Sequence, residues 1–133
     1  MVGGGTSFTS AGVRVSHLFW LSCDVNQYPN ELAVAWGSNN MFSLEAVDTA
    51  VCSDDPSIDE RPPVAGFDTY VGSGHGRYNG IPGATAEWTF TDAGEPGRND
   101  LVKIVIKDAN DQIVLSVSST LQPGGNHQAL RIP

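Results

Sequence analysis

Apolar and polar residues alternate along much of this chain, and the alternation predicts strands. The clearest stretch is residues 84–117, where apolar residues recur at every second position in three separate runs. This period is typical of half-buried strands, each with one face toward a core and one toward solvent. The apolar positions are Ala84, Ala86, Trp88 and Phe90, then Val102, Ile104 and Ile106, then Ile113, Leu115 and Val117.

Further strands are predicted by shorter apolar stretches that lie between turn sequences rich in Gly, Pro and Asn. With the first three they make about eight antiparallel strands. A composition of 15 Gly and 8 Pro agrees with an all-β chain. We therefore expect a β-sandwich of the jelly-roll or Ig-like kind, or a flattened barrel. The additional strands are expected at residues 13–21, 31–36, 41–51, 68–79 and 127–132.

The length of 133 residues fits a single domain with a core of its own. Residues 1–10 are rich in Gly, Ser and Thr, and we expect them to form a flexible arm. The β-sandwich domain is then residues 11–133. The first residues lack the basic and apolar regions of a signal peptide, so we expect a piece cut from a longer secreted precursor.

Charge narrows the possible partners. Seven basic and fifteen acidic residues give a net charge of −8, which repels nucleic acid and anionic membrane surfaces. The chain has no run of eighteen apolar residues, so we expect no membrane insertion. An excess of carboxylates is compatible with a hard cation such as calcium, and also with a merely solubilising surface.

The two cysteines, Cys23 and Cys52, indicate a cellular compartment. Each follows a predicted strand and precedes an acidic turn. No CxxC motif or neighbouring histidine pair suggests zinc. We expect a disulfide between them and a secreted or cell-surface location; two buried free thiols in a cytosolic protein are the alternative.

The loop between the first two runs of residues 84–117 is the most distinctive segment chemically. It concentrates oxygen-bearing side chains among Gly and Pro, and such loops supply calcium ligands. Its spacing does not match an EF-hand, and the same residue types also form turns and caps. The predicted calcium ligands are Asp92, Glu95, Asn99 and Asp100, with possible help from Asp68 or Asp108.

The three histidines, His17, His75 and His127, are an alternative metal site for zinc or copper. No two of them are paired locally, so only the fold could bring them together. An alternative prediction for His17, which lies on an otherwise apolar strand face, is a hydrogen-bonded histidine in the core. The sequence of residues 72–76, GSGHG, places a serine near His75, but it is not the GxSxG motif of a hydrolase.

Aromatic side chains offer a binding platform for sugars or peptides. Tyr28 and Tyr78 lie beside turns and are the predicted ligand-binding residues. The three tryptophans, Trp20, Trp36 and Trp88, fall in register with core positions, and we expect them to be buried.

Several segments resemble a known family. They are VRVSHLFWLSCD, GRYNG, WTFTDAGEPGRND, IVIKD and GGNHQ. In this order they are similar to an uncharacterised small β-domain found toward the carboxyl ends of multidomain secreted bacterial proteins, often beside Ig-like repeats. The resemblance covers residues 11–129 and is most specific at residues 90–97, 99–100 and 125–127. His127 departs from the family pattern, in which a β-branched residue commonly follows Gly-Asn. The resemblance implies an extracellular β-sandwich appended to larger proteins, with no catalytic residues to carry over.

These observations favour a non-catalytic extracellular binding or adhesion module, stabilised by calcium, with a carbohydrate or a protein as ligand. One alternative is a small secreted metal-dependent enzyme that uses the three histidines. Another is a structural subunit that polymerises by strand addition, with residues 1–10 as the donor arm.

Overall fold

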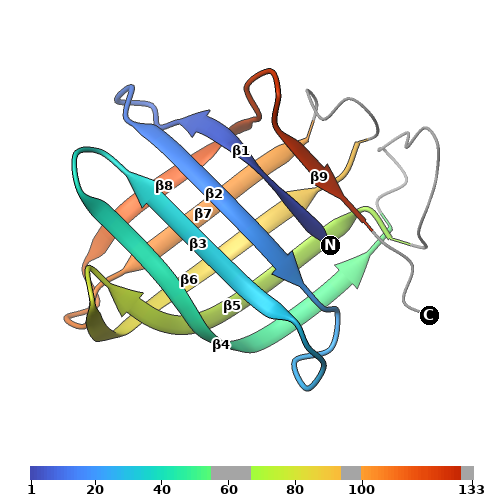
Figure 1. The fold of residues 1–133 in the computed structure, drawn as a ribbon, viewed down its shortest axis with the longest axis horizontal. Helices are drawn as coiled ribbons and strands as arrows, with labels where there is room; N and C mark the ends of the chain where they lie inside the picture. The colour runs from blue at the N-terminus through green and yellow to red at the C-terminus, as the bar shows by residue number, and fades with distance from the viewer. Residues whose placement is uncertain (55–66, 94–99, 130–133) are drawn as a thin grey trace.

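The computed structural model describes residues 1–54, 67–93 and 100–129, and the fold is all-β as predicted (Figure 1). In this described part of the chain, nine antiparallel strands form one sheet. The described residues contain no helix, and so none that could cross a membrane. The strands are β1 (Val2–Phe8), β2 (Arg14–Leu21), β3 (Asn30–Trp36), β4 (Asn40–Ser53), β5 (Thr69–Tyr78), β6 (Ile81–Thr91), β7 (Leu101–Lys107), β8 (Ile113–Thr120) and β9 (Asn126–Gln128).

Strands β1 to β8 pair in chain order, and β9 adds to the free edge of β1. This meander lacks the Greek-key connections of a jelly-roll or Ig-like sandwich. The sheet curls into two layers whose strands cross, with β1 to β3 in one layer and β5 to β8 in the other (Figure 1). The amide of Gln122, after β8, donates to the carbonyl of Thr6 in β1 at 2.9 Å. Of the predicted architectures, the flattened barrel therefore describes the fold, and the jelly-roll and Ig-like sandwiches do not.

Strand β4 is the corner that connects the two layers. It pairs with β3 only over Asn40–Ser43, whereas its pairing with β5 extends from Phe42 to Ser53. The β4–β5 register shifts twice, between Leu44 and Ala46 and between Val47 and Thr49. Because a bulge bends a strand and increases its twist, these two irregularities turn the sheet from one layer into the other.

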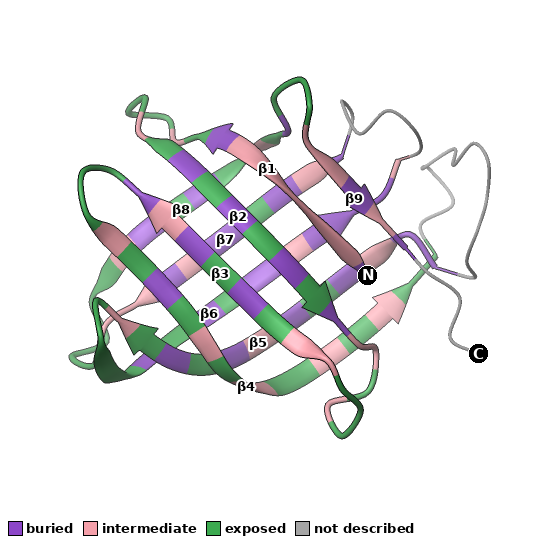
Figure 2. Cartoon of the chain, viewed as in Figure 1, coloured by how far each residue is buried: buried purple, intermediate pink, exposed green. Residues whose placement is uncertain are grey.

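The core lies between the layers and is rich in aromatic rings. Buried and exposed residues alternate along the strands, as the period-two pattern predicts (Figure 2). Trp88 of β6 packs flat against β5 because its neighbour there is Gly72; a Cβ at Gly72 would lie 2.6 Å from the indole. The largest fully buried side chains of the core are Trp88, Tyr70, Phe19, Phe42, Phe90, Leu21, Ile104 and Ile106.

The prediction for the tryptophans was wrong at Trp20. Trp36 and Trp88 are buried, but Trp20 is 52% exposed, on the outer face of β2. Both faces of β2 are apolar near its end, so the alternation alone did not identify the inner one. His17 and Phe19 occupy the inner face, and the period of two places Trp20 outside.

Residues 1–10 differ from the predicted flexible arm. Residues 2–8 form β1, which lies between β2 and β9. Three of its residues are glycines and show no period, yet the missing side chains are what allow β9 to approach: a Cβ at Gly3 would lie 2.4 Å from the carbonyl oxygen of Asn126. Because this segment already pairs on both edges, it is not a free donor arm for polymerisation.

The predicted disulfide between Cys23 and Cys52 is confirmed, with 5.7 Å between the two Cα atoms. Cys23 follows β2 and Cys52 lies near the end of β4, so the bond joins the two layers at one end of the barrel. Beside it, the hydroxyl of Tyr70 donates to the carbonyl of Ser22 at 2.7 Å. Both links cross the opening that β4 leaves where it separates from β3.

Replacing both cysteines by serine, Cys23→Ser with Cys52→Ser, is expected to reduce the free energy of unfolding by about 3 kcal/mol, because the bond closes a loop of roughly 30 residues in the unfolded chain. Urea unfolding of the oxidised and mutated proteins measures the difference. Reduced wild-type protein is the control and is expected to match the double variant. A variant as stable as the oxidised protein would contradict this role.

Candidate functional site

Two adjoining hollows lie on the outer face of β4 to β7, and we call them together the outer groove. Their volumes are about 420 and 290 Å³, and both are lined by Ser73, Glu87 and Val105. Glycines and short side chains such as Gly72, Gly74 and Ser73 line much of the groove, among longer charged side chains. The remaining lining side chains that point outward are Asp48, Thr49, Val71, Thr85, Thr89, Lys103, Lys107 and Asp111.

Strand register explains how these residues come together. Ser73 of β5 lies opposite Thr49 of β4 and Glu87 of β6, and Glu87 lies opposite Val105 of β7. Outward positions recur at every second residue, so each neighbouring row repeats the arrangement. The groove is therefore built on four paired strands rather than on loops.

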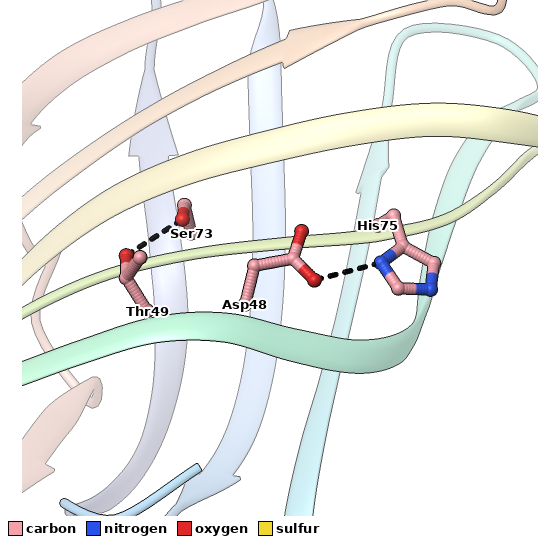
Figure 3. Close-up of polar contacts among 4 residues, drawn as sticks. All are labelled: Asp48, Thr49, Ser73 and His75. Atoms are coloured by element: carbon pink, nitrogen blue, oxygen red, sulfur yellow. Dashed lines mark hydrogen bonds and ion pairs between the residues drawn. The ribbon is translucent and has the colours of Figure 1, made fainter.

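Two hydrogen bonds orient the β4 and β5 side of the outer groove (Figure 3). Thr49 Oγ1 and Ser73 Oγ are 2.7 Å apart, and His75 Nδ1 is 2.9 Å from Asp48 Oδ1. His75 and Asp48 are each about half exposed. The contacts hold the side chains against the sheet and leave the centre of the groove open.

The serine and histidine of the GSGHG segment share a face, as their spacing predicts, but they belong to different hydrogen-bonded pairs. Ser73 bonds to Thr49, whereas His75 bonds to Asp48 (Figure 3). A serine nucleophile needs a base within hydrogen-bond distance of its hydroxyl. In this arrangement Ser73 is a polar lining residue of the groove.

The outer groove combines hydrogen-bond donors and acceptors without one dominant charge. Glu87 and Asp48 are acceptors, Lys103 is a donor, and four hydroxyl groups serve as either. Lys107 lies 3.8 Å from Asp111, which offsets part of its charge. Such a surface suits a neutral ligand with many hydroxyl groups better than an anion.

The residues predicted to bind calcium are separated by the structure into two groups. Glu95 and Asn99 lie outside the described residues. Asp92 and Asp100 are buried and accept hydrogen bonds from backbone amides. Within the described ranges, no group of three or more His, Cys, Asp or Glu side chains is placed to hold a metal ion. Calcium binding by this loop stays a prediction.

Asp92 and Asp100 attach β9 and the residue after it to the barrel. Asp100 Oδ2 accepts from the amide of His127 at 2.7 Å, and Asp100 Oδ1 accepts from the amide of Ala93 at 2.7 Å. Asp92 Oδ2 accepts from the amide of Ala129 at 2.9 Å. Buried carboxylates with several amide donors are strong acceptors. The loop therefore has an evident structural task.

Two of the three histidines meet inside the barrel, while the third lies on its outer surface. His17 Nε2 and His127 Nε2 are 2.7 Å apart, and both rings pack against Phe19 and Phe90, which stack on each other. Two imidazole nitrogens on one tetrahedral zinc ion would be about 3.3 Å apart. The pair is thus a direct hydrogen bond, and His75, on its outer strand face, is not part of it. The prediction that His17 is a hydrogen-bonded core histidine matches this contact.

The hydrogen bonds determine which nitrogens carry protons in this pair. His127 Nδ1 faces the carbonyl of Thr91 at 3.0 Å and must donate to it. In the neutral ring its Nε2 is then an acceptor, so His17 Nε2 donates. His17 Nδ1 is left as a buried acceptor with no partner among the described residues.

Burial opposes protonation of both rings. It lowers the pKa of His17 to about 4. The pKa of His127 falls to about 3 through burial and the nearby His17, with the Thr91 carbonyl acting in the opposite direction. Both histidines are consequently neutral at pH 7.

Neither of the predicted ligand-binding tyrosines is among the residues that line the outer groove. Tyr28 is 86% exposed in the connection between β2 and β3. Tyr78 ends β5, stacks on Trp36 and donates to Asn40 Oδ1 at 2.9 Å. The groove was not predicted from the sequence, because it is lined by the polar residues that alternate with the apolar core residues of each strand. The sequence feature that could have indicated it is the recurrence of Thr, Glu and Lys at the outward positions of residues 85–89 and 103–107.

Asp100→Ala is expected to reduce the free energy of unfolding by about 2–4 kcal/mol, since it removes the acceptor of the buried His127 amide and of the part-buried Ala93 amide. Asp108→Ala is the matched control. Asp108 Oδ1 also accepts from two amides, those of Asn110 and Gln112, but at an exposed turn where water can replace it; about 1 kcal/mol is expected. Urea unfolding compares them, and equal losses would contradict the role of Asp100.

Acid is expected to destabilise the fold through the histidine pair. Below pH 6.5 the unfolded chain binds protons at these rings, while the folded chain does not until about pH 4. The free energy of unfolding should therefore fall as pH decreases from 6.5 toward 4. His17→Phe should be less stable at pH 7 and should show a smaller fall in the free energy of unfolding than wild type. Urea unfolding across this range measures both, and an unchanged slope in His17→Phe would be the contrary result.

Comparison of the chain with protein-family models, with curated proteins and with solved structures finds no match in any of the three.

Proposed function

We propose that this chain is a secreted, non-catalytic binding module that holds a carbohydrate chain in the outer groove. The observation that carries the proposal is the groove itself, two adjoining hollows on a four-stranded surface that are lined by hydroxyl, carboxylate and ammonium groups.

The chemistry of the lining suits sugar hydroxyls, which both donate and accept hydrogen bonds. Glu87, in the row shared by the two hollows, is an exposed carboxylate that can accept from adjacent hydroxyls. Lys103 on one side and the hydroxyls of Ser73 and Thr49 on the other supply donors. The groove crosses four strands, about 14 Å at the usual strand spacing, so an extended ligand would contact both hollows.

The disulfide supports secretion, and the net charge supports a neutral ligand. A bond between Cys23 and Cys52 is typical of an oxidising compartment. A net charge of −8 disfavours anionic partners such as nucleic acid, and this agrees with a neutral glycan as the ligand.

The test is binding of soluble neutral polysaccharides by affinity gel electrophoresis, followed by calorimetry on any that retard the protein. Glu87→Gln and Ser73→Ala are expected to weaken binding about tenfold each, because each removes a hydrogen bond to the ligand. Asp24→Asn is the matched control, since Asp24 is an exposed carboxylate in the connection between β2 and β3, outside the groove, and it should bind as wild type. Retardation that is equal in all three variants, or absent with every polysaccharide, would remove the proposal.

A further inference from the structure

The outer face of β1, β2 and β3, which we call the front face, is unusually apolar. Leu18 is 69% exposed and Trp20 52%. With Val2 and Ala33 they line a hollow of about 290 Å³. Four of the nine exposed large hydrophobic side chains in the described residues lie on this face or directly beside it on β4. They are Phe8, Leu18, Trp20 and Met41.

Small residues surround Leu18 and Trp20 and keep the front face flat. Leu18 lies between Gly4 of β1 and Ala33 of β3, and the next row of β2 and β3 contains Ser16 and Ala35. The side chains of Leu18 and Trp20 therefore project above a surface that is formed by small residues. Two such faces can interdigitate, because the large side chains of one fill the low surface of the other.

Charge on the front face is balanced although the chain is acidic. Its charged side chains, in three fully described strands, are Arg14 at one end and Glu31 at the other. The net charge of −8 is thus carried elsewhere. Two copies that meet through this face bring no excess of like charge together.

Arg14 and Glu31 make the front face complementary to itself. Arg14 begins β2, and Glu31 pairs with Trp20 near the other end of β2. A two-fold axis lying between two facing copies and crossing the middle of β2 places Arg14 of one copy over Trp20 and Glu31 of the other. Each copy then gains one ion pair and one contact between a guanidinium and an indole.

We propose that two copies of this chain form a dimer by packing their front faces together around this axis. Including β4 and β9 at its margins, the face measures roughly 24 by 23 Å from strand spacing and rise. The area buried by two copies is near the lower limit for specific interfaces. The dimer is therefore reversible, and its population depends on concentration.

The arrangement has a consequence that rests on the proposed function. The outer groove is on β4 to β7, in the layer opposite the front face (Figure 1). Dimerisation through the front faces directs the two grooves away from each other. The dimer would then link two separate carbohydrate chains, and simultaneous binding would raise its avidity.

Sedimentation velocity over micromolar to millimolar concentrations tests the dimer without any ligand. Wild type is expected to shift from monomer to dimer, and Trp20→Ala to raise the dissociation constant about tenfold or more. Ile113→Ala is the control, because Ile113 is also an exposed hydrophobic residue, 62% accessible, but on β8. A wild-type chain that stays monomeric at the highest concentration overturns the proposal and leaves the front face for another partner. A dimer that Trp20→Ala leaves intact overturns it as well.

Charge reversal tests the geometry. Arg14→Glu alone and Glu31→Arg alone place like charges opposite each other twice per dimer, so each should weaken self-association about tenfold. An equimolar mixture of the two variants should recover wild-type association, because each contact then joins opposite charges. Recovery supports the two-fold arrangement, and its absence overturns it. Polysaccharide binding is measured on monomeric Trp20→Ala, so failure of the dimer and failure of the groove are separate results.

Discussion

The structure depends on one constraint: a single sheet must supply both walls of its own core. A flat meander of these strands would leave Phe19, Phe90 and Trp88 on an open face. The sheet instead bends at β4, where two register shifts lie within a few residues, and the inner faces of the two layers meet. Bending separates β3 from β4 beyond Ser43. The disulfide and the bond from Tyr70 to Ser22 lie across that separation and hold the layers together.

Buried polar groups hold the last strand near this same end of the barrel, where the amide of Asp92 donates to the carbonyl of Asp68 and the amide of Asp68 to the carbonyl of Ser53, next to Cys52. Asp92, Asp100 and the histidine pair lie where β9 joins β1, and their hydrogen bonds connect β6, the segment before β7, β9 and β2. Asp100 accepts from two backbone amides and Asp92 from the amide of Ala129, and a buried carboxylate is tolerated where it is hydrogen-bonded in this way. Thr91, Asp92, Asp100 and His127 belong to this one network. The physical task of these four residues is to attach the last strand.

Much of the fold followed from the period of two. Strands around Val15, Trp88, Ile104 and Leu115 were predicted because each alternates cleanly. Strand β1 was not predicted, because its glycines give no alternation of apolar and polar residues. These glycines are needed for the close approach of β9, which the sequence alone does not show. The disulfide followed from two cysteines in matching contexts. The meeting of His17 with His127 is a contact across 110 residues that no local pattern encodes, and the outer groove depends on a register among four strands.

The two outer faces differ because the meander gives each layer its own exposed surface. In the layer of β4 to β7, the outward positions carry charges and hydroxyls, which resist close packing of another sheet because each polar group would lose water. In the layer of β1 to β3, Gly4, Ala33 and Ala35 remove that barrier, and Leu18 and Trp20 gain by leaving water. Solubility alone would favour polar residues at these outward positions. An apolar front face therefore indicates a surface that is covered in use, whereas the polar outer groove can remain hydrated until a ligand replaces its water.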